Sequence, residues 1–66
     1  MKDRLKQLRR EKGLTQKQVA NAIGVVPTAI TNYESGIREP SIAVLKKLCL
    51  FYDVSADYLI GLSDDY

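Results

Sequence analysis

Apolar residues recur along this chain every three or four positions, in short stretches that polar residues separate. The stretches cover roughly residues 2–12, 15–24, 26–36, 42–52 and 55–61. All four glycines fall at the ends of these stretches, where helices tend to stop. The pattern predicts an all-α fold, a compact five-helix domain in which residues 1–66 form a single unit.

Four of the predicted helices also begin with a residue that is typical of a helix start. Thr15, Ser41 and Ser55 can each offer a hydroxyl to a free backbone amide of the first helical turn. Thr15 and Gln18 fit a capping box, in which each side chain binds the other residue's backbone amide. Pro27 suits the first position of the third helix, where its missing N–H costs nothing.

The helical period also selects the residues that should face the core. The core positions that it predicts are Leu5, Leu8, Val19, Ala20, Ile23, Val26, Ile30, Tyr33, Ile42, Leu45, Leu48, Cys49 and Tyr52. Leu14, between the first two predicted helices, is also expected to pack inward. Because Cys49 lies within this set, we interpret it as a small core residue and not as a reactive thiol.

The segment from Gln16 to Glu34 has the spacing of two short helices joined by a tight turn. Ala20 is small enough for a neighbouring helix to cross close to it, and Gly24 can adopt the positive φ that a sharp turn needs. Ile30 is the apolar anchor of the second helix. This spacing is the helix-turn-helix pattern, whose second helix fits a DNA major groove.

The similarity to known proteins extends beyond this segment, through YESGIREPS at 33–41 and VSADYLIG at 54–61. From about Leu5 to Leu62 the chain resembles the Xre or Cro/C1-type helix-turn-helix family, the DNA-binding domains of phage repressors and of many small bacterial regulators. The resemblance implies a lambda-repressor-like DNA-binding domain. It also implies a sequence-specific double-stranded DNA-binding transcriptional regulator, a repressor that binds a palindromic operator as a dimer.

The chain departs from the family at the start of the recognition helix, about residues 27–35. Val26, which cannot cap, stands where Ser or Thr is frequent. Pro27 and Thr28 stand where longer polar residues are common, so the family's base contacts do not transfer to this chain.

The candidates for reading bases lie on the outward, uncharged face of this helix, near its N-terminus. They are Pro27, Thr28, Thr31 and Asn32. The Asn32 amide can both donate to and accept from adenine, and the two threonines offer a hydroxyl and a methyl group. Pro27 offers only apolar contact. The alternative is that this side of the helix is an ordinary polar surface that binds nothing.

Phosphate contacts are expected at the start of the second helix, where free amides and a partial positive charge attract anions, and along the edges of the groove. Gln16 can bridge from that helix end to a phosphate, and the resemblance implies the same role for it. The candidates are Arg10, Thr15, Gln16, Lys17, Ser35 and Arg38.

Glu34 is a lone carboxylate on the inner edge of the third helix. Similar proteins pair an arginine at the position of Arg9 with this glutamate, so the resemblance implies an Arg9–Glu34 ion pair. A bidentate pair would satisfy both charges and would fix the first helix against the third. The alternative is two independent, exposed charges.

The net charge is only +2, but its distribution is uneven. Residues 1–17 hold seven of the ten basic residues, whereas residues 48–66 hold four acidic residues and no Lys or Arg. A basic front and an acidic back suit a polyanion bound on one side. The alternative is that the first helix has an ordinary solvated face.

This sequence lacks the residues on which several classes of protein depend. With one cysteine and no histidine, we expect no internal disulfide, no metal site, no cofactor and no catalytic residues. No signal peptide or membrane span is recognisable, so we expect a cytoplasmic protein with no membrane partner. No small-molecule ligand is evident either.

We expect double-stranded DNA and a second copy of the chain as partners, with Phe51, Ile60 and Leu62 near the two-fold axis. The alternative for these residues is that they close the core of the monomer. An alternative function is an antitoxin-like protein-interaction module with secondary DNA binding. The sequence shows no long toxin-wrapping tail after Leu62, which favours the regulator.

Overall fold

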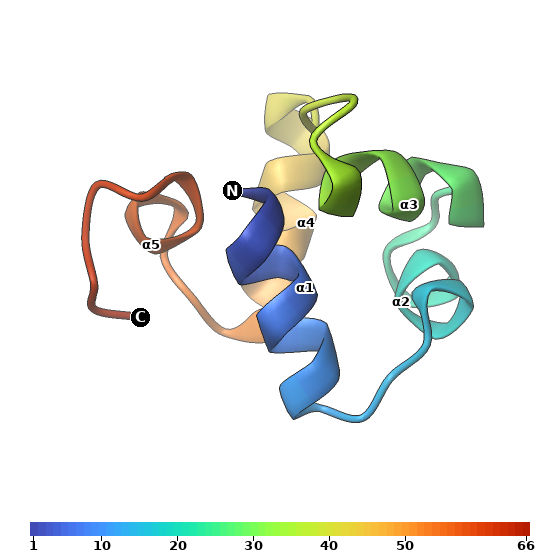
Figure 1. Ribbon diagram of the computed structural model, residues 1–66, viewed down its shortest axis with the longest axis horizontal. Coiled ribbons are helices and arrows are strands. Elements are labelled where there is room, and N and C mark those ends of the chain that lie inside the picture. The colour runs from blue at the N-terminus through green and yellow to red at the C-terminus, as the bar shows by residue number, and fades with distance from the viewer.

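The computed structural model describes all 66 residues and contains five helices and no strand. The helices are α1 (Lys2–Glu11), α2 (Gln16–Ile23), α3 (Pro27–Ser35), α4 (Ile42–Tyr52) and α5 (Ala56–Ile60) (Figure 1). The all-α, five-helix fold predicted from the sequence is therefore confirmed, with helix bounds close to those expected.

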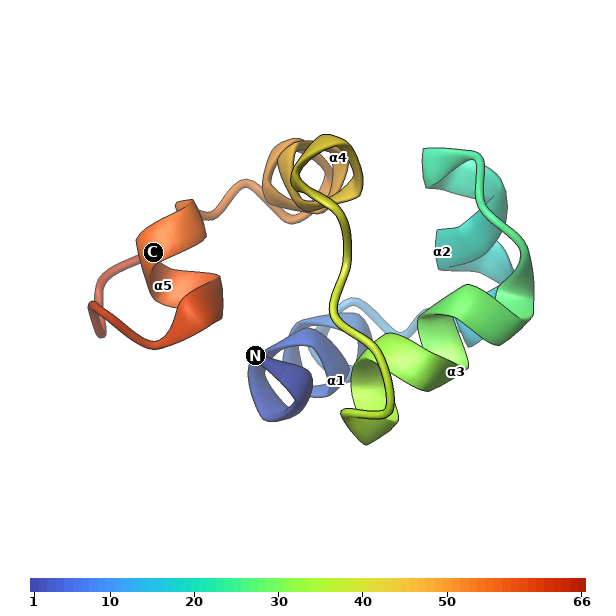
Figure 2. The ribbon, with the colours of Figure 1, turned by 90° about the horizontal axis from the view of Figure 1, so that it is seen from above.

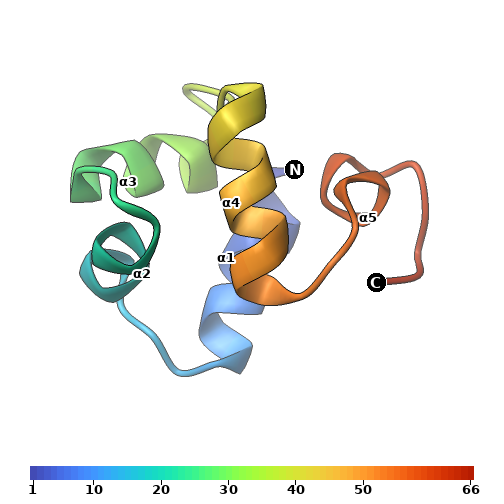
Figure 3. The same cartoon turned by 180° about the vertical axis from the view of Figure 1, so that it is seen from behind.

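The five helices surround one core (Figure 2). Helix α2 packs against α3 and α4, α3 also packs against α1, and α5 packs against α4. Seen from behind, α4 lies in front of α1, with α2 and α3 on one side and α5 on the other (Figure 3). The helix-turn-helix and the C-terminal helix are thus at opposite ends of the molecule.

Side chains from all five helices and from the α4–α5 linker form the core. Its buried residues are Leu5, Leu8, Val19, Ala20, Ile23, Ile30, Leu48, Tyr52, Val54, Tyr58 and Leu59. Ala20 is completely buried, which is consistent with the close packing of α2 against its neighbours. The α2–α3 turn uses the positive φ of Gly24, 77°, as its sequence position predicts.

The expected caps are present at the starts of three helices. The Thr15 hydroxyl accepts a hydrogen bond from the Gln18 amide, and the Gln18 side chain accepts one from the Thr15 amide, so the capping box is complete. Ser41 and Ser55 each accept a hydrogen bond from the backbone amide three residues later. The hydroxyl side chains thus fix where α2, α4 and α5 begin.

Two residues predicted to face the core do not. Val26 is 66% exposed and Ile42 is 69% exposed. Val26 is the N-cap of α3 and Ile42 is the first residue of α4, so both lie where the chain arrives from a loop. The helical period places them on the inner side, but each helix begins to pack only after these positions.

None of the five helices combines the length and the apolar composition that crossing a membrane requires.

Candidate nucleic-acid interface

Helix α3 separates a buried side from an exposed side. Ile30 and Glu34 are buried against α1 and α2, whereas Pro27, Thr28 and Thr31 are exposed. Asn32 is half-buried. The four candidate base-reading residues therefore all keep some surface accessible, and none of them carries a charge.

The start of α2 lies beside this exposed side. The capping box engages the amide of Gln18, but the amides of Gln16 and Lys17 donate to no acceptor within the protein. The dipole of α2 adds a partial positive charge at the same place. This helix end is thus prepared for an anion such as a phosphate, and Lys17 is exposed next to it.

Arg9 and Glu34 form the ion pair expected from the sequence. Arg9 Nε lies 2.8 Å from Glu34 Oε2, and Arg9 Nη2 lies 3.0 Å from Glu34 Oε1. Arg9 Nη1 also donates to the Leu14 carbonyl at 2.8 Å. Glu34 is only 3% exposed, so the pair joins α1 to α3 inside the protein. The hydrogen bond to Glu34 raises the pKa of Arg9 above its ordinary value.

A phenol lies close to this pair. Burial, followed by the negative charge of Glu34, raises the pKa of Tyr52 to about 12. Tyr52 therefore stays neutral at ordinary pH. Burial also raises the pKa of the Cys49 thiol, which is half-buried as its position in the helical pattern suggested.

Gln16 connects the ion pair to the exposed side of α3. Its Nε2 donates to Glu34 Oε1 at 3.3 Å, and its Oε1 accepts from the Thr31 hydroxyl at 2.7 Å. The sequence suggested a phosphate contact for Gln16 and a base contact for Thr31, but it gave no sign that the two bind each other. The structure thus links Arg9, Glu34, Gln16 and Thr31 in one hydrogen-bonded chain.

The other phosphate candidates lie on other elements than the start of α2. Arg10 is exposed on the outer side of α1, in a row of mixed charge with Lys6 and Glu11. Ser35 is exposed at the end of α3, and its hydroxyl donates to the Asn32 carbonyl at 3.2 Å. Arg38 is exposed in the α3–α4 loop.

Arg4 has a role that sequence reasoning missed. Its guanidinium donates to the carbonyls of Tyr58 and Ser63 and to Asp64, and it lies 4.2 Å above the ring centre of Tyr58. The partners are more than fifty residues away in the sequence and two are backbone carbonyls, so no local signal marks them. Arg4, like Arg9, is therefore occupied within the protein instead of adding to a free basic surface.

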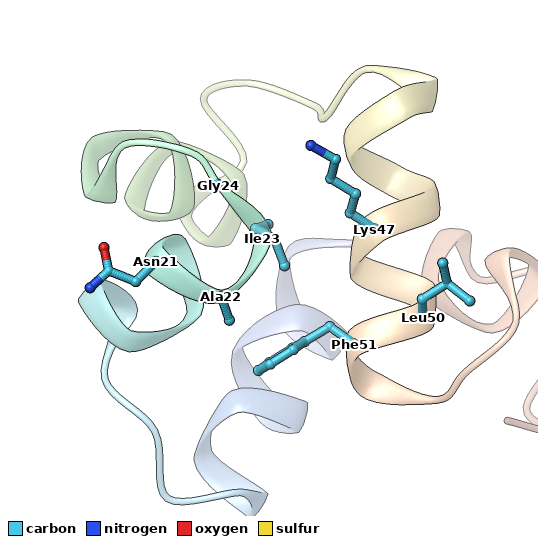
Figure 4. A pocket seen from close by; sticks show the side chains of 7 residues that line it. All are labelled: Asn21, Ala22, Ile23, Gly24, Lys47, Leu50 and Phe51. Atoms are coloured by element: carbon cyan, nitrogen blue, oxygen red, sulfur yellow. The ribbon is translucent and has the colours of Figure 1, made fainter.

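The residues predicted to form a dimer interface do not share one surface. Ile60 and Leu62 are exposed beside α5, at 44% and 77%. Phe51 is half-buried, stacks edge-to-face on Tyr52 and lines a groove between α4 and α2 (Figure 4). Figure 4 shows Phe51 pointing towards α1 and α2, whereas Leu50 points away, towards α5. Phe51 thus lies on the side of α4 that faces α1 and α2, and not on the side that faces α5.

Known proteins match both the sequence and the fold. The family model described as "Helix-turn-helix" matches residues 5–59. The uncharacterised HTH-type transcriptional regulator YobD of Bacillus subtilis is 42% identical over 62 residues, which cover 94% of this chain and 55% of that protein. This chain spans about half the length of the curated relatives that it matches.

Two solved structures show the same fold at recognisable sequence identity. The P22 c2 repressor in complex with a synthetic operator has a TM-score of 0.85 and 28% identity, over 88% of each chain. The N-terminal DNA-binding domain of SinR from Bacillus subtilis has a TM-score of 0.81 and 33% identity, over 89% of this chain and 87% of that one. Because the family model covers most of the chain and the fold agrees, the protein belongs to the helix-turn-helix family, of the Cro/C1 type.

Proposed function

We propose that this protein is a sequence-specific, double-stranded DNA-binding transcriptional regulator with no enzymatic activity. The observation that carries the proposal is the exposed, uncharged side of α3 next to the free amides of Gln16 and Lys17 at the start of α2. The exposed side of α3 suits contact with base edges, and the start of α2 suits contact with a phosphate. The match to a repressor whose structure includes an operator supports the same function.

In this proposal α3 enters the major groove. Thr28, Thr31 and Asn32 contact base edges, and Pro27 makes apolar contact at the groove wall. The phosphate contacts come from both sides of the groove. Their proposed residues are Arg10, Thr15, Gln16, Lys17, Ser35 and Arg38.

The direct experiment is a selection of bound sites from random duplex DNA. We expect a recurring half-site of a few base pairs, present in two inverted copies whose centres are about 34–36 Å, one helical turn, apart. This result would also give the operator sequence. Recovery of no enriched sequence would contradict the proposal.

Asn32→Ala is expected to weaken binding to the selected site by about 1–3 kcal/mol, because the amide can make a bidentate contact with adenine. Binding to unrelated DNA should hardly change, since that binding depends on phosphates. Titration of both DNAs by fluorescence anisotropy measures the two effects. Asn21→Ala is the matched control, because Asn21 is exposed on α2 beside the α2–α4 groove. Equal losses on both DNAs would contradict a base contact by Asn32.

We also propose that the working unit is a repressor dimer on a palindromic operator. One recognition helix reads too few base pairs to single out a genomic site, and a two-fold pair doubles the number. Helix α5 lies at the end of the molecule opposite the helix-turn-helix (Figure 1). Ile60 is its last residue and Leu62 follows it, and both are exposed apolar residues. These two residues form the proposed interface. Phe51 is left out of it, because it is partly buried against the core and lines the groove between α4 and α2.

Ile60→Asp is expected to abolish cooperative binding to a full operator while leaving binding to a half-operator unchanged, because a charge at the two-fold axis would face its own copy. Analytical ultracentrifugation with labelled DNA gives the number of protomers bound. Ala22→Asp is the control, since it adds the same charge at an exposed position of α2. An Ile60→Asp protein that still binds in cooperative pairs would rule out this interface.

A further inference from the structure

The two ends of the Gln16 amide are fixed by different partners. A carboxylate can only accept hydrogen bonds, so the group of Gln16 that faces Glu34 must be its NH₂. The carbonyl oxygen of the amide then faces Thr31, and an amide carbonyl can only accept. The short contact of 2.7 Å between Gln16 Oε1 and Thr31 Oγ1 therefore takes its proton from Thr31.

Glu34 is held firmly enough to determine this orientation. It is almost fully buried and binds Arg9 through both of its oxygens. A carboxylate tied in two places cannot rotate to offer Gln16 a different surface. The direction of the amide thus follows from an ion pair inside the protein, not from solvent.

The only other acceptor within reach of the Thr31 hydroxyl also directs its proton into the protein. The Pro27 carbonyl lies 3.4 Å from Thr31 Oγ1 and belongs to the same helix. A hydroxyl has one proton, and both acceptors draw that proton towards the protein. The exposed side of Thr31 Oγ1 is left with lone pairs.

We propose that Thr31 reads DNA only as a hydrogen-bond acceptor, and so selects a base pair that presents an amine to it. In the major groove the amines are N4 of cytosine and N6 of adenine, whereas guanine O6 and N7, thymine O4 and the phosphates are acceptors. The inference rests on the proposed function and adds to it a specificity rule for one residue. Glu34 acts as a positioning residue, through Gln16.

The test removes single amines from the selected half-site. Each adenine is replaced in turn by purine and each cytosine by 2-pyrimidinone, which lack the exocyclic amine, and dissociation constants are measured for the wild type and for Thr31→Val. At one position we expect the wild type to lose about three- to tenfold in affinity, the effect of a single hydrogen bond. At that position Thr31→Val should show no such loss beyond the change in the duplex itself.

Two further variants identify the cause. Thr31→Ser keeps the hydroxyl, so it should restore the sensitivity to the missing amine. Gln16→Met removes the nearer of the two inward acceptors and leaves only the Pro27 carbonyl, which at 3.4 Å holds the Thr31 proton weakly. The discrimination between an amine and a carbonyl should therefore fall at that position alone, beside a uniform loss of affinity from the missing phosphate contact. Unchanged discrimination in Gln16→Met would overturn the role of the Gln16 amide.

The outcomes separate this inference from the function on which it rests. If the selection yields no preferred site, the proposed function itself fails. If a site is found but no adenine or cytosine in it is coupled to Thr31, or the coupled base pair presents guanine O6 or thymine O4 to Thr31, the acceptor-only rule is overturned and the DNA-binding function stands.

Discussion

Glu34→Ala is expected to lower the free energy of unfolding by about 3–5 kcal/mol, because it leaves the Arg9 guanidinium charged, largely buried and without its partner. A domain of this length has a total stability of only about 3–10 kcal/mol, so the loss would be a large part of it. Urea denaturation followed by circular dichroism measures the change.

The control and the compensating variant use the same measurement. Glu39→Ala removes an exposed carboxylate of the α3–α4 loop and should change the stability by no more than about 0.5 kcal/mol. Replacing both partners, as Arg9→Met with Glu34→Leu, should cost much less than Glu34→Ala, because no charge is left unpaired. An unfolding midpoint that Glu34→Ala does not move would show that the pair contributes nothing.

The second large effect concerns salt. A dimer that contacts about six phosphates should show log K falling with log salt at a slope near −5, from roughly −0.9 per contact. Between about 50 and 200 mM salt the affinity would fall about a thousandfold. The physical reason is the release of cations condensed on the DNA when basic groups replace them. An affinity that does not change with salt concentration would contradict the phosphate contacts and the proposed mode of binding.

Single variants show which basic residues take part. Lys17→Ala or Arg38→Ala should flatten the slope by about one unit for each phosphate that the variant no longer binds. Lys46→Ala is the control, because Lys46 lies on α4 in a groove shared with α5. If Lys46→Ala flattened the slope as much as Lys17→Ala, the proposed orientation on DNA would be wrong.

The fold was largely predictable because the helix ends carry local signals. Thr15, Ser41 and Ser55 act through amides three residues away, and Gly24 determines the backbone at its own position. The end of α4 had no such marker: Asp53 adopts a positive φ of 56° there, in place of a glycine.

The site was predictable only in part, because its contacts join distant segments. The Arg9–Glu34 pair could be predicted from the family resemblance. The hydrogen bonds of Gln16 to Thr31 and Glu34 could not, because they depend on how α2 lies against α3. Arg4 was counted with the basic front, although its partners lie at the other end of the chain. A charge pattern records the number of basic residues and not which of them the fold already uses.

The division of α3 into a buried side and an exposed side affects how such a protein can change over generations. Thr28 and Asn32 form no side-chain hydrogen bond within the protein, and both keep accessible surface. Substitutions there can retarget the protein to another operator while the scaffold stays constant. Thr31 is more constrained, since any replacement without a hydroxyl also releases Gln16 from one of its two partners. Divergent copies should therefore acquire new binding sites first through positions 28 and 32.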